Sequence, residues 1–236
     1  VSVTSARPTE ELSAELSGSY NNDFDATDIN GFISGGITSN LRGRFAFQDQ
    51  QMDEGWMHNS FYDQDIPQSD ENGGRAILEW DVTDATLVML KYEYSRWHGL
   101  GQPWTLITTG YIPGVEAGTK YNGNIGNNGS FVVNDLGQPA SVVGNIDPID
   151  FGSNNSSDGD NNETMLKVEH QFDNQSTLTL LTGYSTYDFK RSLDADYNPL
   201  PGLRYDDKED YEQASVEIRF ASNTGETLEY LGGLYY

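Results

Sequence analysis

Apolar and polar residues alternate with a period of two along most of this chain. The clearest stretch is residues 86–97, where one side carries Val88, Leu90, Tyr92 and Tyr94 and the other carries Met89, Lys91, Glu93 and Ser95. Successive side chains of a β-strand face opposite sides, so the pattern predicts a strand with one apolar face. The same analysis predicts nine strands, at residues 9–20, 27–37, 41–49, 74–82, 86–97, 163–173, 177–188, 210–221 and 227–236.

Short and long connections alternate strictly between these predicted strands. The short ones are residues 38–40, 83–85, 174–175 and 223–226, and the long ones are residues 21–26, 50–73, 98–162 and 189–209. One end of the sheet therefore carries only turns, and the other end carries the elaborated loops. This asymmetry is typical of outer-membrane barrels, with short periplasmic turns and long extracellular loops. We therefore expect an all-β, antiparallel up-and-down transmembrane β-barrel, present as a partial barrel of about nine strands.

The two faces of the predicted strands differ in the way that a barrel wall requires. The longest aliphatic run, "LVML", excludes a transmembrane helix, but barrel strands hide their apolar residues in alternation. We expect a lipid-facing set of Leu78, Val88, Leu90, Val216 and Ile218, and a lumen-facing set of Glu79, Lys91, Glu169, Glu217 and Arg219. Tyrosines and tryptophans gather at strand ends, as an interfacial girdle requires. The alternative is a secreted β-sandwich that acts as an adhesion or glycan-binding module.

Composition narrows the range of partners and chemistry. The 236 residues carry no Pro/Ser-rich linker, which favours one domain over residues 1–236, and the formal net charge of -24 argues against nucleic acid as a partner. The absence of cysteine excludes disulfides, thiolate nucleophiles and cysteine-type zinc sites. The three histidines, His58, His98 and His170, are too scattered to predict a metal site. No catalytic triad, carboxylate pair or nucleotide fingerprint is apparent, so we expect neither an enzyme nor a cofactor.

The predicted loops hold the candidate binding residues. Residues 49–71 carry seven acidic side chains and no Lys or Arg, which suits a cationic or metal-bearing ligand, divalent ions near lipopolysaccharide, or a simple solvated surface. Ligand contacts are expected from aromatic and histidine side chains of the two longest loops: Trp56, His58, Tyr62, Trp97, His98, Trp104 and Tyr111. The stretch "SDGDNNE" at 157–163 spaces its oxygen ligands like a calcium loop, but its incomplete pattern favours a flexible loop tip.

The succession of strands resembles the N-terminal part of the barrel of a TonB-dependent outer-membrane receptor. The resembling segments are "ARPTEELSAELSGSY", "GGITSNLRGRFAFQDQ", "NGGRAILEWDVTDATLVMLKYEYSR", "TLTLLTGYSTYDF" and "YEQASVEIRFASNTGETLEYLGGLYY". Together they cover nearly the whole chain outside the long loops.

The resemblance implies an activity, a location and partners. Such receptors enclose a plug in a barrel of about 22 strands, and they take up a scarce ligand, commonly a ferric siderophore, in the bacterial outer membrane, with energy supplied through TonB. The implied partners are outer-membrane lipid, lipopolysaccharide, the small-molecule ligand, and TonB acting through the plug. No plug is present among these residues, so we expect the chain to be a portion of a longer polypeptide. A passive porin is the nearest alternative function.

Overall fold

Nine strands of the chain form one antiparallel sheet. The computed structural model describes residues 4–59, 64–101, 155–194, 204–223, 225 and 227–236. Its strands are β1 (Ser13–Asn21), β2 (Ala26–Gly36), β3 (Leu41–Met52), β4 (Met57–Asn59), β5 (Gln64–Ile66), β6 (Gln68–Thr83), β7 (Thr86–Leu100), β8 (Ser156–Gln171), β9 (Thr177–Asp194), β10 (Arg204–Ala221) and β11 (Leu231–Tyr235). The sheet order is β1-β2-β3-β6-β7-β8-β9-β10-β11, while β4 and β5 pair as a separate hairpin. The expected up-and-down arrangement of nine strands is confirmed.

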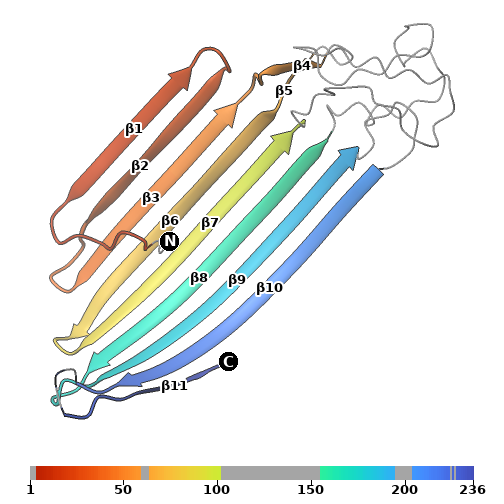
Figure 1. Cartoon of the computed structure of the whole chain (residues 1–236). Helices are drawn as coiled ribbons and strands as arrows, with labels where there is room; N and C mark the ends of the chain where they lie inside the picture. Colours follow the sequence, from red (N-terminus) through yellow and green to blue (C-terminus); the bar gives the residue numbers. More distant parts are fainter. Residues whose placement is uncertain (1–3, 60–63, 102–154, 195–203, 224, 226) are drawn as a thin grey trace, which may run out of the picture.

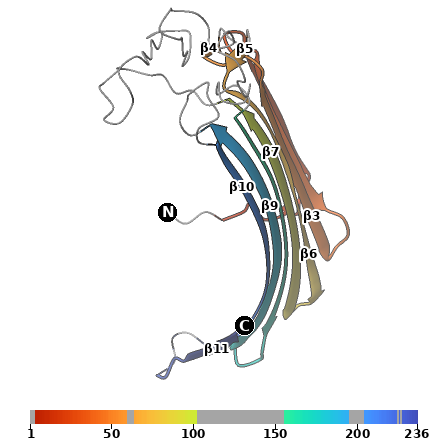
Figure 2. The same ribbon diagram turned by 90° about the vertical axis from the view of Figure 1, so that its right-hand side faces the viewer.

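The sheet is strongly curved and is not closed. Figure 1 shows the turns after β2, β6 and β8 at one end, which we call the turn end, and the β4–β5 hairpin at the other, the loop end. Figure 2 shows the curvature from the side, with the segment that precedes β1 lying on the concave side. The chain therefore forms the wall of a partial β-barrel. The described part of the chain contains no helical segment with the length and hydropathy of a membrane span.

The convex face is apolar, and the concave face is polar. Trp80, Val88, Val168, Leu180 and Ile218 stand directly opposite one another across β6 to β10 on the convex face. The neighbouring row on the concave face consists of Glu79, Met89, Lys167, Leu181 and Glu217. The side chains that the alternation assigns to lipid and to lumen are thus separated onto the convex and concave faces respectively.

Within the described part of the chain, neither face of the nine-stranded sheet is covered by a second layer. Among the described residues, the buried apolar side chains are only Met57, Ile66 and Ile77, whereas large apolar side chains of the convex face, such as Trp80 and Leu90, are more than 40% exposed. A β-sandwich buries one face of each sheet against the other. The single open sheet therefore argues against the sandwich and for a barrel wall.

The apolar band of the convex face crosses the strands obliquely. One row of directly paired residues on the convex face begins at the aromatic Tyr20 on β1 and ends at the charged Lys208 on β10. On β10 the apolar positions, Ala214 to Phe220, lie nearer the turn end. Barrel strands are tilted by about 35–45° from the axis, so a level band must drift across the register rows in this way.

Several strand limits differ from the prediction: β1 begins at Ser13 rather than 9 and β11 at Leu231 rather than 227, whereas other strands are longer than expected. β8 begins at Ser156 rather than 163, so "SDGDNNE" is part of a strand and its prediction as a loop tip is wrong. β9 and β10 likewise extend further toward the loop end. The residues added to β8 are polar on both faces, so they lack the alternation that marks a strand. The β4–β5 hairpin was not predicted.

Candidate ligand-binding site on the concave face

The two adjacent candidates at the end of β7 lie on opposite faces. Trp97 is half-buried on the concave face. His98 is exposed on the convex face, where its Nδ1 lies 2.6 Å from Oδ1 of Asp158 on β8. Because neighbouring strand residues point to opposite sides, these two side chains cannot contact one ligand on the same surface.

The candidates in the β3–β6 connection form a separate group. Trp56 packs edge-on against Phe24, with ring centroids 6.3 Å apart. His58 on β4 lies 2.8 Å from Asp65 on β5, Nδ1 to Oδ1. Their hairpin has a small core of its own, since Met57 and Ile66 are buried. The remaining candidates, Tyr62, Trp104 and Tyr111, lie outside the described residues.

Three aromatic rings cluster on the concave wall near the loop end. Trp97 stacks on Tyr187 with a centroid distance of 5.8 Å and an angle of 29°, and Tyr187 stacks on Phe189 at 6.1 Å and 12°. The centroids of Trp97 and Phe189 are 6.5 Å apart, at 30°. We call Trp97, Tyr187 and Phe189 the aromatic shelf. The planes of the three rings lie within 30° of one another, and all three side chains are half-buried.

Gly159 is what allows the Trp97 indole to lie against the wall. It stands between Trp97 and Phe189 in the register of β7, β8 and β9. A Cβ added at Gly159 would lie 2.0 Å from Cζ2 of Trp97, which is impossible without displacing the ring. The shelf therefore depends on a glycine at this position of β8.

Carboxylates flank the aromatic shelf on both sides. Glu71 on β6 stands directly opposite Trp97, and Glu209 on β10 stands directly opposite Phe189. Both side chains are exposed, and neither has an ion-pair partner within the described part of the chain. The nearest cation in the register, Arg191, is paired with Asp207, with Nη2 3.3 Å from Oδ2.

Deeper on the concave face, ion pairs connect neighbouring strands. Arg75 on β6 donates two hydrogen bonds to Glu93 on β7, at 2.8 and 2.6 Å. Lys91 lies 2.7 Å from Glu163 on β8 and 3.4 Å from Glu93. A polar wall of this kind suits a water-filled or protein-filled lumen and does not suit contact with lipid.

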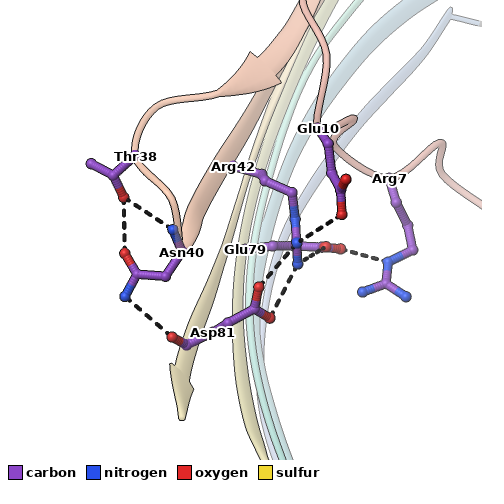
Figure 3. Close-up of polar contacts among 7 residues, drawn as sticks. All are labelled: Arg7, Glu10, Thr38, Asn40, Arg42, Glu79 and Asp81. Carbon is purple, nitrogen blue, oxygen red and sulfur yellow. Dashed lines mark hydrogen bonds and ion pairs between the residues drawn. The ribbon is translucent and has the colours of Figure 1, made fainter. Parts of the chain in front are cut away.

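The segment before β1 is fastened to the concave face by a second network of charges (Figure 3). Arg7 Nε donates to Oε1 of Glu79 at 2.6 Å, and Nη2 of Arg42 lies 3.6 Å from Oε2 of the same carboxylate. Glu79 is only 2% exposed. Its hydrogen bond raises the pKa of the Arg7 guanidinium above its ordinary value. Arg42 also contacts Asp81 at 2.9 Å and Glu10 at 3.9 Å.

The aspartates of "SDGDNNE" lie on the convex face beyond the apolar band. Asp158 pairs with His98, and Asp160 lies 3.5 Å from Arg96. In the same area, a hydrogen bond to Asp210 raises the pKa of Asp188, and a hydrogen bond from Lys208 lowers the pKa of Asp210. No group of three acidic or histidine side chains suited to a metal ion occurs among the described residues.

Sequence reasoning did not identify Tyr187, Phe189, Glu209 or the Arg7–Glu79 pair. One signal was available in "TGYSTYDF", where the aromatic positions change parity between Tyr184 and Tyr187. That change places Tyr184 on the convex face and Tyr187 on the concave face. The pairing of Arg7 with Glu79 had no signal, since these residues are remote in sequence.

Comparison with known proteins identifies the fold. No protein-family model and no curated protein matches the chain. Among solved structures, a chain of the FpvAI–pyocin S2 complex aligns with a TM-score of 0.65 and 16% identity over 98% of this chain and 27% of that chain. The ferric-catecholate import receptor Fiu from E. coli K12 aligns with a TM-score of 0.62 and 13% identity over 98% and 32%. The ferripyoverdine receptor of the outer membrane of Pseudomonas aeruginosa, bound to ferripyoverdine, aligns with a TM-score of 0.56 and 18% identity over 92% and 25%.

The matched structures and this chain share one architecture at low sequence identity. The chain spans about a third or less of the length of each matched chain. The matched structures are β-barrel receptors, and the order, curvature and faces of the strands agree with that architecture. The chain therefore has the fold of a segment of a receptor-type β-barrel wall.

Proposed function

We propose that this chain is part of an outer-membrane receptor that captures a scarce small ligand and takes it up with energy supplied through TonB. The observation that carries the proposal is the division of the sheet into an apolar convex face and an ion-paired concave face, with the aromatic shelf at the loop end. The convex face would contact lipid, and lipopolysaccharide would lie beside its polar extension. Residues 1–236 would then be one barrel segment in the outer membrane.

The ligand is proposed by analogy with the matched structures. Fiu is a ferric-catecholate import receptor, and the Pseudomonas aeruginosa receptor binds ferripyoverdine. A ferric siderophore is therefore the first class to test. Transport rather than catalysis is the proposed activity, and the contacts of residues 4–12 would hold the chain before β1 on the lumen side.

Topology is tested by labelling single cysteines, which the chain permits because it contains none of its own. Glu54→Cys, in the long β3–β6 connection, should react with an impermeant maleimide on intact cells. Ser39→Cys, in the β2–β3 turn, should react only after the outer membrane is opened. The reverse pattern would contradict the orientation.

Energised uptake is tested by growth under iron limitation on a panel of ferric siderophores. Cells that carry the receptor should respond to at least one ferric siderophore, and deletion of TonB should abolish the response. Uptake that persists without TonB would instead support the passive porin, which remains the second candidate because the polar concave face suits a water-filled pore equally well.

A further inference from the structure

We infer that the aromatic shelf binds a flat, positively charged ring system and selects against anionic ligands of the same shape. The inference deepens the proposed function, because it names the ligand class of the same receptor. It rests on that function for the role in uptake, whereas the binding itself can be measured separately.

The charges around the rings are arranged to favour a cation. A single register row on the concave face reads Glu71, Trp97, Gly159, Phe189, Glu209 across β6 to β10. Strands are spaced by about 4.8 Å, so each carboxylate is one strand away from a ring. A cation stacked on the rings would gain attraction from the ring faces and from both carboxylates. An anion in the same place would be repelled by both carboxylates.

The chain itself already places a flat cation near one ring of the shelf, that of Phe189. The guanidinium carbon of Arg191 lies 5.8 Å from the centroid of Phe189 and 5.3 Å from that of Tyr205. Planar guanidinium groups stack on aromatic faces for the reason that would hold a cationic ligand here. Arg191 is not free to recruit an anion, because Asp207 compensates its charge at 3.3 Å.

The long-range electrostatic field of the protein also favours cations. The chain carries a formal net charge of -24, and the described concave wall around the shelf contains three carboxylates and one guanidinium, those of Glu71, Asp207, Glu209 and Arg191. A field of this sign raises the local concentration and the association rate of cations. It opposes the approach of a ferric catecholate, which is an anion, so among the ferric siderophores of the proposed function the inference favours cationic ligands over the class in the name of Fiu.

The test compares tricyclic probes of the same shape and opposite charge on the purified receptor in detergent. Proflavine is the cation, and anthracene-2-sulfonate is the anion. Binding is measured by equilibrium dialysis and by the change in tryptophan fluorescence. We expect proflavine to bind and the sulfonate not to bind at the same concentration. Equal affinity for the two probes overturns the inference.

Paired variants separate local recognition from attraction to an acidic protein. The double variant Glu71→Gln with Glu209→Gln should weaken proflavine binding about tenfold, which corresponds to about 1.4 kcal/mol. Asp70→Asn with Asp210→Asn makes the same change in net charge at the adjacent positions on the convex face, and it should leave the affinity unchanged. If both double variants weaken binding equally, the cation is bound by bulk charge and the inference is wrong.

The rings are tested by two independent substitutions. Gly159→Ala should push the Trp97 indole off the wall and weaken proflavine binding, whereas Gly74→Ala, where the new Cβ meets only ordinary contacts at 3.7 Å or more, should not. Trp97→Leu should weaken binding as well and does not depend on the glycine. Unchanged affinity in Trp97→Leu overturns the role of the shelf. Failure of the cysteine-labelling or TonB experiments, with probe binding intact, would instead remove only the proposed function.

Discussion

Replacing Glu79 by alanine should detach the segment before β1 from the barrel wall. Glu79 accepts the hydrogen bond from Arg7 Nε at 2.6 Å and lies within 3.6 Å of Arg42. With the carboxylate removed, Arg7 loses the side-chain partner that holds it on the sheet. Arg42 keeps its contact with Asp81 at 2.9 Å, so the wall itself should stay intact.

The expected loss is about 1–2 kcal/mol for the docking of residues 4–12. A hydrogen bond to a charged group is worth about 1.5–3 kcal/mol. Breaking a fully buried ion pair costs about 3–5 kcal/mol, because it leaves a buried charge without a partner. Here the Arg7 side chain is 59% exposed and can be hydrated once it is released, so the cost of a fully buried pair does not apply. The value for a hydrogen bond to a charged group applies instead, and solvent screening reduces it to about 1–2 kcal/mol.

Residue-resolved hydrogen exchange on the receptor in detergent measures this loss directly. The amide of Thr9 donates to Oγ of Ser34 at 2.9 Å, and the amide of Gly36 donates to the carbonyl of Glu10 at 3.0 Å. Both amides should exchange about 5- to 30-fold faster in Glu79→Ala, since that is the factor that 1–2 kcal/mol produces.

A matched control is available on the same face. Glu217→Ala removes the partner of Arg219, whose Nε donates to it at 2.9 Å on β10, and should leave the exchange of Thr9 unchanged. Unchanged exchange of Thr9 in Glu79→Ala would refute the view that this carboxylate fastens the segment.

Two further predictions concern the faces of the sheet. Leu90→Arg, near the middle of the apolar convex band, should destabilise the folded barrel by about 2–4 kcal/mol, whereas Leu181→Arg on the concave face should cost much less. Urea titration of the refolded barrel measures both free energies of unfolding, and equal costs would contradict the assignment of faces. Asp188, beyond the apolar band, has a pKa raised by its hydrogen bond to Asp210. Its stabilising contribution is therefore present below the ordinary pKa of an aspartate and is lost as the pH rises through the higher pKa of the folded state. Asp188→Asn should abolish this dependence and slow amide exchange at the loop end of β9 and β10 at neutral pH; an unchanged pH profile in this variant would contradict the pairing.

The order and facing of the nine strands of the main sheet could be predicted because they depend on a local signal. In β7 the side chains alternate from Val88 to Ser95 because one side of the strand faces an apolar environment and the other does not. Each strand shows this alternation in its own sequence. The alternation of turns and long connections then determines which ends lie together. Neither inference needs a contact between residues that are remote in sequence.

The ends of the strands at the loop end could not be predicted, because the alternation of apolar and polar residues is missing there. From Ser156 to Asn162, β8 is polar on both faces, so the sequence has the composition of a loop. These residues are strand because β7 and β9 pair with them along their whole length. Backbone pairing, unlike alternation, leaves no mark on side-chain composition.

The aromatic shelf was hidden by the same stretch of sequence. If "SDGDNNE" is taken as a loop, Gly159 is an ordinary loop glycine and the aspartates resemble a calcium-binding pattern. Placed in β8, the same residues divide by parity: Asp158 and Asp160 lie on the convex face with His98 and Arg96, and Gly159 lies on the concave face under the Trp97 ring. A shift of one residue in the pairing of β7 with β8 would exchange these faces and bring an aspartate against the indole. The shelf is therefore a property of strand register, and its existence depends on the pairing of β8 with both neighbours rather than on any motif within β8.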